Sequence, residues 1–169
     1  MKRNLSNLMQ LLALTIVLAL LMPEMTHAQA GKANFAGTWA MNAERSTQPQ
    51  GGGGGGGRGM FGGNFTVAQD ANSLSQTRTG QDGTARTTKY TLDGKESVNT
   101  FGNGGESKST ATWSADGKSL TIVTKMIFNG NDFTSSAVWT LTDAKTLSIL
   151  STRQGQNSEQ KTTMVYDKK

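Results

Sequence analysis

The sequence predicts an all-β protein, an antiparallel up-and-down meander of about eight to ten strands that closes, or nearly closes, into a barrel. Three observations predict this fold. After residue 64 the chain has no proline and runs in short segments rich in Thr, Val, Ile, Phe and Trp, as β-strands do. Gly, Asp and Asn interrupt these segments regularly, as hairpin turns require. After residue 30 no apolar pattern of helical period extends far enough to form a helix.

The first 30 residues have the layout of a secretory signal peptide. Two basic residues precede the apolar run Leu11–Met22, and small residues follow it, with cleavage expected after Ala28 or Ala30. The run is shorter than the roughly 20 residues that span a bilayer, and no cysteine follows it to carry a lipid. We therefore expect a Sec-type signal helix in residues 1–30, and a periplasmic or secreted bacterial protein without a membrane anchor once it is removed.

One strand and a glycine-rich loop come next. Residues 31–44 hold the first predicted strand, and residues 45–63 include an unbroken run of glycine, Gly51–Gly57. No Lys-Ser or Lys-Thr follows the glycines, although a phosphate-binding loop requires one. We expect a flexible loop that crosses the mouth of the barrel.

Residues 64–169 complete the single barrel domain with hairpins of two alternating kinds. Because successive turns of a meander lie at opposite ends of the sheet, tight turns should close one end, and any ligand should enter at the other. The alternative to a closed barrel is an open, strongly curled half-barrel that pairs with itself. The tight turns begin at Asp70, Asp93, Asp116 and Asp143, and the looser, glycine-rich turns lie near Gly80, Gly102, Gly130 and Gly155.

Side chains alternate between the two faces of a strand, so each apolar residue predicts which neighbours face the interior. Trp113 and Trp139 stand just before aspartate turns and should help to seal that end. The weaker alternative for the tryptophans is an exposed aromatic surface that binds sugars. The predicted core and floor residues are Phe35, Trp39, Trp113 and Trp139.

The same alternation directs polar side chains inward. A guanidinium group inside a barrel is costly unless it is paired or hydrated, so inward arginines imply a wet cavity with room for a carboxylate or phosphate. The alternative is that each arginine lies near a strand end and reaches solvent. The predicted ligand-binding residues are Gln76, Arg78, Arg86, Tyr90, Arg153 and Tyr166.

Catalytic and metal chemistry lack their usual residues. The chain has no cysteine, and its one histidine, His27, lies in the predicted signal peptide. Six aspartates fall in predicted turns, where bonding to the turn backbone is a sufficient role for them: Asp70, Asp82, Asp93, Asp116, Asp132 and Asp143. We predict no enzyme, no cofactor and no metal site, with a catalyst built from carboxylates or serine as the residual alternative. The basic residues are scattered singly, so we expect no nucleic-acid partner.

The segment Asn34–Asn42 resembles the opening of lipocalin and fatty-acid-binding barrels, the calycin type, in which a Gly-x-Trp on the first strand closes the barrel floor with a buried indole. The number of strands is more similar to the fatty-acid-binding branch. The chain also resembles small secreted bacterial lipocalin-like proteins of unknown function, which share the glycine-rich stretch and an ending of the type Val165–Lys168. One departure is that residues 45–63 have no helical signal, whereas fatty-acid-binding barrels carry a helical lid there.

The resemblance implies a binding function. Fatty-acid-binding barrels hold a carboxylate with interior arginine and tyrosine, which are the residue types of the predicted site. We therefore expect an exported lipocalin-like barrel that binds a small hydrophobic, amphipathic or anionic ligand non-covalently. The alternative is a structural or interaction module of the cell envelope or extracellular matrix, with no cavity.

Overall fold

The computed structural model describes residues 31–47, 63–80, 82–101, 104–128, 130–154 and 159–169. The predicted signal peptide (residues 1–30) lies outside the described residues. So does most of the predicted glycine-rich loop, from residue 48 to residue 62.

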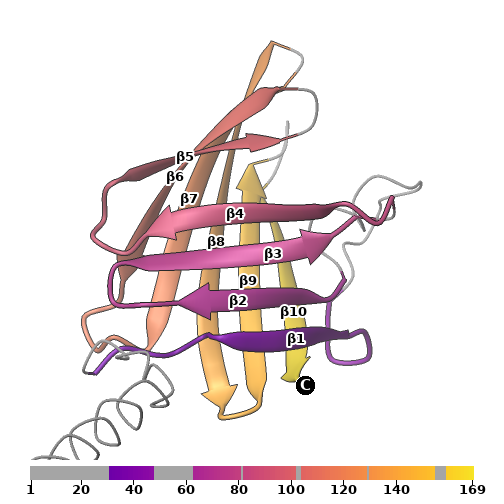
Figure 1. Ribbon diagram of the computed structural model, residues 1–169, viewed down its shortest axis with the longest axis vertical. Coiled ribbons are helices and arrows are strands. Elements are labelled where there is room, and N and C mark those ends of the chain that lie inside the picture. Colours follow the sequence, from indigo (N-terminus) through magenta and orange to yellow (C-terminus); the bar gives the residue numbers. More distant parts are fainter. Residues whose placement is uncertain (1–30, 48–62, 81, 102–103, 129, 155–158) are drawn as a thin grey trace, which may run out of the picture.

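The described chain forms ten antiparallel strands in one continuous sheet (Figure 1). Each strand pairs with its neighbour in sequence except at β4 and β5, and the first strand pairs with the last. This arrangement confirms the predicted all-β meander, and the barrel is nearly closed. The strands are β1 (Gly37–Asn42), β2 (Phe65–Gln69), β3 (Ser73–Thr79), β4 (Ala85–Thr91), β5 (Glu96–Phe101), β6 (Gly105–Trp113), β7 (Ser119–Phe128), β8 (Asn131–Asp143), β9 (Thr146–Gln154) and β10 (Glu159–Lys168).

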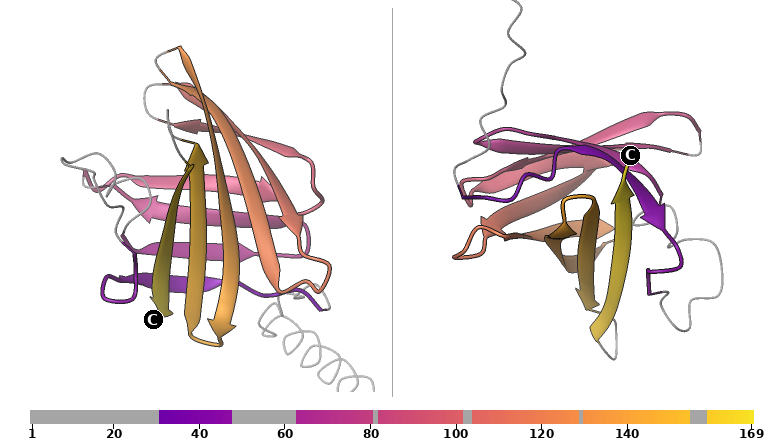
Figure 2. Two further views of the ribbon diagram at one scale, coloured as in Figure 1. Left: turned by 180° about the vertical axis from the view of Figure 1, so that it is seen from behind. Right: turned by 90° about the horizontal axis from the view of Figure 1, so that it is seen from below.

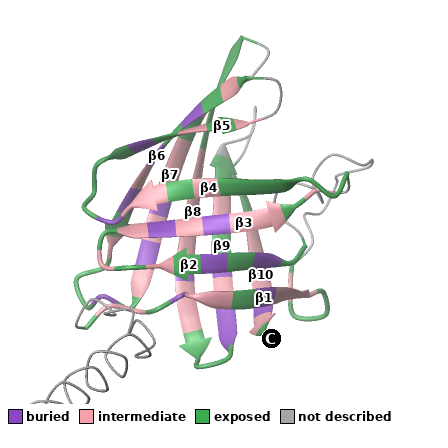
Figure 3. Ribbon diagram, viewed as in Figure 1, coloured by how far each residue is buried: buried purple, intermediate pink, exposed green. Residues whose placement is uncertain are grey.

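The sheet bends into two layers that cross each other. Strands β1 to β4 run across strands β7 to β10, and the views from behind and from below show one layer lying over the other (Figure 2). Buried and exposed residues alternate along strands such as β2, which is the pattern of a sheet with one face inward (Figure 3). The inner faces of the two layers enclose the interior of the barrel.

The edge strands β4 and β5 meet through side chains in place of a backbone ladder. The Thr91 N–H donates to Ser97 Oγ at 2.8 Å, and the Asn99 side chain bonds to the backbone of Lys89. These contacts close the barrel at the one junction where consecutive strands are not paired.

The four aspartate turns lie together at one end of the barrel, here called the aspartate end. In each turn a carboxylate accepts the backbone N–H two residues further on, at 2.7 Å for Asp70 and Asp143 and at 3.1 Å for Asp93 and Asp116. Such bonds hold the turn closed without help from the strands. The turns at the opposite end, the glycine-rich end, include residues outside the described part of the chain.

An aromatic cluster fills the aspartate end. Phe35 and Trp39 are fully buried, and the Trp39 indole N–H donates to the Phe35 carbonyl at 2.8 Å. The Phe35 ring stacks on Trp113 at 5.8 Å between centroids and meets Trp139 edge-on at 5.7 Å. Trp139 is buried and Trp113 is partly buried against the same core. The four predicted floor residues therefore touch one another as one cluster.

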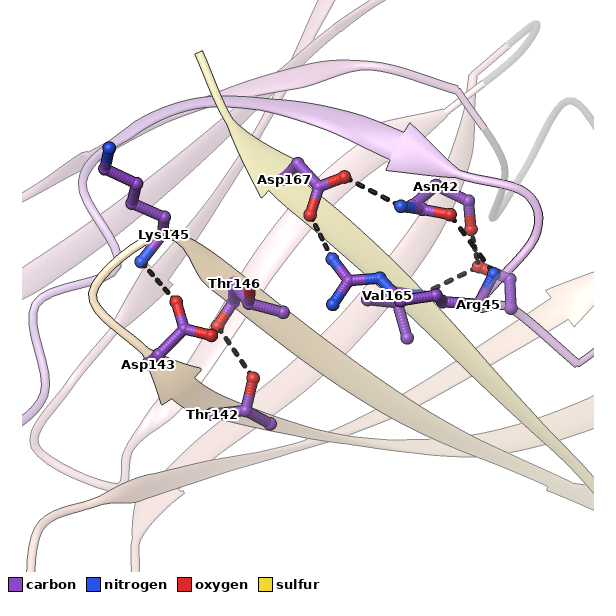
Figure 4. Close-up of polar contacts among 9 residues, drawn as sticks. Asn42, Arg45, Thr142, Asp143, Lys145, Thr146, Val165 and Asp167 are labelled. Carbon is purple, nitrogen blue, oxygen red and sulfur yellow. Dashed lines mark hydrogen bonds and ion pairs between the residues drawn. The ribbon is translucent and has the colours of Figure 1, made fainter.

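Polar contacts join the last strand to the segment after β1 (Figure 4). Asp167 forms an ion pair with Arg45 and accepts a hydrogen bond from the Asn42 amide at 2.8 Å. The Ser46 hydroxyl donates to the Asn42 carbonyl and accepts the Val165 N–H at 2.9 Å. The pairing of β1 with β10 thus continues beyond the end of β1.

Candidate functional site

A cavity of about 200 Å³ lies between the two crossing layers, toward the glycine-rich end. Strands β3 and β4 supply one wall with polar and aromatic side chains, and strands β5 to β10 supply the other. The lining residues are Gln76, Arg78, Thr88, Tyr90, Phe101, Ser107, Ser109, Ile122, Thr124, Met126, Ser135, Ala137, Trp139, Ile149, Ser151, Met164 and Tyr166.

Arg78 brings a positive charge to this cavity. Its guanidinium carbon lies 4.5 Å from the centre of the Phe65 ring, and its Nη1 donates to the Gly63 carbonyl at 3.4 Å. Among the ion pairs of the described residues none involves Arg78, so no carboxylate there neutralises it. A guanidinium held by an aromatic ring and a carbonyl keeps donors available for an anion.

Two tyrosines accompany Arg78. Burial raises the pKa of Tyr90 to about 12, although the Arg78 charge acts in the opposite direction. Burial also raises the pKa of Tyr166, again opposed by the charge of Arg78 and by a hydrogen bond between the two side chains. Both phenols are therefore protonated at neutral pH and can donate hydrogen bonds to an anion.

The structure brings together four of the six predicted ligand-binding residues. Gln76, Arg78, Tyr90 and Tyr166 all line the cavity, on strands β3, β4 and β10. Gln76 is 8% exposed. No hydrogen bond joins its amide to another described side chain or backbone group, so this amide also faces the cavity with bonding capacity unused.

Arg86 and Arg153 are placed outside the cavity lining. Arg86 is the cross-strand neighbour of Arg78, and its guanidinium turns to the Asp82 carboxylate at 3.1 Å, with 64% of the side chain exposed. Like charges directly opposite each other are unfavourable, so the ion pair with Asp82 holds Arg86 away from Arg78. Arg153 is exposed near the end of β9. Both positions follow the alternative in which arginines near strand ends reach solvent.

A second hollow of about 340 Å³ lies at the aspartate end, between two aspartate turns and β6. Lys32 Nζ lies 5.4 Å from the centre of the Trp113 ring there, while the Trp113 indole N–H is buried with no partner among the described residues. The described residues contain no group of three or more His, Cys, Asp or Glu side chains that could hold a metal ion. Within the same residues, no helix has the length and apolar character needed to cross a membrane.

The architecture matches a known ligand-binding barrel. The structure of the zebrafish ileal bile acid-binding protein, solved in complex with cholic acid, superposes with a TM-score of 0.56 at 14% sequence identity. The match covers 80% of this chain and 98% of that one. The chain has the fatty-acid-binding-protein-like calycin fold.

The other comparisons give a weaker structural match or no match. A mutant of the fluorescent protein UnaG is similar at a TM-score of 0.48 and 15% identity, over 80% of this chain and 96% of that one. No family model matches the sequence, and no curated protein matches it either.

Several residues that line this calycin cavity were not among the predicted site residues, above all the hydroxyls of strands β6 to β8. Ser109 lies two residues before the buried Ala111, Thr124 two after Ile122, and Ser135 two before Ala137. Side-chain alternation directs all three inward from these apolar neighbours, as it directs Arg78 inward from Leu74.

Proposed function

We propose that the protein binds a small amphipathic or anionic molecule non-covalently in the interior of its barrel. The observation that carries this proposal is Arg78, a guanidinium beside the cavity with no carboxylate partner among the described residues. A cation in such a place is costly unless an anion or water balances it. The neutral phenols of Tyr90 and Tyr166 can donate hydrogen bonds to the same anion.

The rest of the cavity suits the apolar part of an amphipathic molecule. Ile122, Met126, Trp139, Ile149 and Met164 line it from strands β7 to β10. Apolar surface moved from water to such a wall contributes about 25 cal/mol per Å². An arginine and two tyrosines for the acid group, together with apolar residues for the rest of the molecule, would therefore orient the ligand as well as hold it.

The likeness in fold supports this reading. A bile acid-binding protein with the same barrel architecture is known in complex with cholic acid. That likeness also favours a binding role over catalysis. The cavity argues against the alternative of a packed structural module, because side chains fill the interior of such a module and do not enclose a space of about 200 Å³ beside a cation.

We further propose that the protein acts after export, in the periplasm or outside the cell. The support is the tripartite pattern of residues 1–30. Fractionation of expressing bacteria, together with the N-terminal sequence of the purified protein, tests this proposal. A product that begins at Gln29 or Gly31 supports it, and an uncleaved cytoplasmic product contradicts it.

Calorimetric titration with hydrocinnamic acid, a small acid with one apolar ring, tests the binding function. Arg78→Gln should weaken binding about ten-fold or more, since a hydrogen bond to a charged group contributes roughly 1.5–3 kcal/mol. Arg86→Gln is the matched control, because that side chain is exposed and paired with Asp82. Equal affinity in the Arg78 variant would show that the cavity does not use this guanidinium.

A further inference from the structure

Hydroxyl side chains form a row across four consecutive strands on the inner face of the barrel. The strand registers pair Ser97 of β5 with Ser109 of β6, Ser109 with Thr124 of β7, and Thr124 with Ser135 of β8. Directly paired residues project from the same face of a sheet. We call Ser97, Ser109, Thr124 and Ser135 the hydroxyl row; the last three line the cavity.

Packing does not explain the hydroxyl row. The adjacent row toward the aspartate end is apolar, with Ala111 paired to Ile122 and Ile122 paired to Ala137. Burying a hydroxyl without a hydrogen-bond partner costs free energy, whereas an apolar side chain at the same site would add to the core. Ile122 and Ala137 of that row also line the cavity, so apolar and hydroxyl rows lie side by side on the same wall.

The row keeps hydrogen-bonding capacity unused. The hydroxyls of Ser109 and Thr124 bond to each other at 2.9 Å, which leaves this pair one donor and several lone pairs. No hydrogen bond joins the Ser135 hydroxyl to another described residue. Ser97 is already occupied, because its Oγ accepts the Thr91 N–H at 2.8 Å. Ser109, Thr124 and Ser135 are thus the members that can meet a ligand.

The opposite wall is polar as well. Gln76 and Thr88 are cross-strand neighbours on β3 and β4, and both line the cavity. These strands lie in the layer that crosses β7 to β9 (Figure 1). Polar groups therefore line the cavity from both layers. A hydrocarbon ligand would remove water from both walls without replacing its hydrogen bonds.

The volume of the cavity limits the size of the ligand. A volume of about 200 Å³ is below the ~300–1,000 Å³ of typical ligand pockets and equals roughly seven water molecules at ~30 Å³ each. The enclosed part of a ligand must therefore be about the size of one substituted ring or a short chain.

We propose that the ligand is a compact acid whose apolar body carries hydroxyl or carbonyl groups, and that Ser109, Thr124 and Ser135 determine this specificity. The inference rests on the proposed function, in which Arg78 receives the acid group. A site built to hydrogen-bond polar groups discriminates against an analogue that lacks them, because its own polar groups then stay unpaired.

Two acids with the same carbon skeleton test this inference by calorimetry on the purified protein. Dihydrocaffeic acid, which has two ring hydroxyls, should bind about ten-fold more tightly than hydrocinnamic acid, which has none. Ser109→Ala combined with Ser135→Ala should remove most of that preference and leave the affinity for hydrocinnamic acid within about two-fold. Thr110→Ala combined with Ser136→Ala is the control, since these neighbours lie on the outer face of the same strands and should change neither affinity.

Each outcome separates this inference from the proposed function. Equal affinity for the two acids, with both lost in Arg78→Gln, overturns the inference about the hydroxyl row and leaves the proposed function intact. A preference that persists in the double variant also overturns the role of the row. Absence of binding by either acid counts against both proposals. Thermal unfolding of the variants, and the two single serine variants, separate a change in affinity from a loss of the fold.

Discussion

The side-chain amide of Asn99 takes the place of a β-strand partner for Lys89. The Lys89 N–H donates to Asn99 Oδ1 at 2.8 Å, and Asn99 Nδ2 donates back to the Lys89 carbonyl at 2.9 Å. A paired backbone residue would make the same two bonds. This contact lies at the junction of β4 and β5, where the sheet order has its two ends.

We predict that Asn99→Ala loosens this junction. The variant leaves two backbone groups of Lys89 to water, and a typical intramolecular hydrogen bond contributes about 1 kcal/mol, so unfolding should become easier by about 1–2 kcal/mol. Urea denaturation measures the change, and amide exchange should accelerate at Lys89 and Thr91 first. Lys89→Ala is the control because it keeps both backbone bonds. Equal stability of Asn99→Ala and the natural protein would mean that the junction does not depend on this amide.

The structure explains why the Gly-x-Trp motif begins with a glycine, Gly37. Its φ angle is +138°, and a Cβ at this position would lie 2.5 Å from Lys168 Cε. The Lys168 side chain crosses the glycine to place its ammonium group 5.4 Å from the centre of the Trp39 ring. The missing side chain at Gly37 thus makes room for a cation over the buried indole.

Gly37→Ala should therefore lower the free energy of unfolding by about 1–3 kcal/mol. Thermal unfolding of this variant, alone and combined with Lys168→Ala, separates the two causes. If the backbone angle is responsible, the loss remains in the double variant. If the contact with Lys168 is responsible, the loss largely disappears there. A variant as stable as the natural protein would contradict both explanations.

The aspartate turns predict a loss of stability in acid. Hydrogen bonds from backbone N–H groups and neighbouring hydroxyls hold the pKa of Asp70, Asp116 and Asp143 below the ordinary value of 3.8. A hydrogen bond from the Lys95 side chain, followed by one from the Lys95 backbone N–H, lowers the pKa of Asp93 in the same way. A carboxyl whose pKa is lower in the folded state stabilises the fold above its unfolded pKa, and this contribution disappears as pH falls through the folded pKa. Stability should therefore be constant from neutral pH to about pH 5 and decrease below about pH 4.

Replacement of these aspartates by asparagine tests whether their carboxyl groups cause the loss of stability in acid. Asn keeps an acceptor for the turn but does not titrate, so Asp93→Asn combined with Asp116→Asn should flatten the acid limb of the stability curve. Melting temperatures across the acid range provide the measurement. An unchanged acid limb would assign it to other carboxyl groups.

The alternation of side chains predicted the cavity wall where a strand runs regularly through the interior. Leu74, which is fully buried, fixes the inward direction of Gln76 and Arg78 on the same strand, and Met164 does so for Tyr166. Arg86 follows the same alternation from Tyr90 but lies near its strand end. There the Asp82 carboxylate competes for its guanidinium, and alternation alone carries no information on that competition.

The hydroxyl row required the strand register. Alternation from the buried Ala111 directs Ser109 inward and Thr110 outward, but it does not show which hydroxyls of different strands are neighbours. Only the pairing of Ser109 with Thr124, and of Thr124 with Ser135, places them side by side. The gap between β4 and β5 is equally invisible in the sequence, since the turn at Asp93 and Gly94 resembles the other aspartate turns.

The tyrosines of the cavity predict a second loss of stability, in alkali. Burial raises the pKa of Tyr90 to about 12 from the model-compound value of 10.0, and it raises the pKa of Tyr166 as well. Between these two pH values the folded protein keeps the Tyr90 proton while the unfolded chain loses it, so the free energy of unfolding falls as pH rises. Tyr90→Phe should show a shallower alkaline decline in melting temperature, and Tyr90→Phe combined with Tyr166→Phe a shallower one still. A decline of equal slope in all three proteins would mean that these phenols are hydrated through the cavity and titrate in the folded state as they do in water.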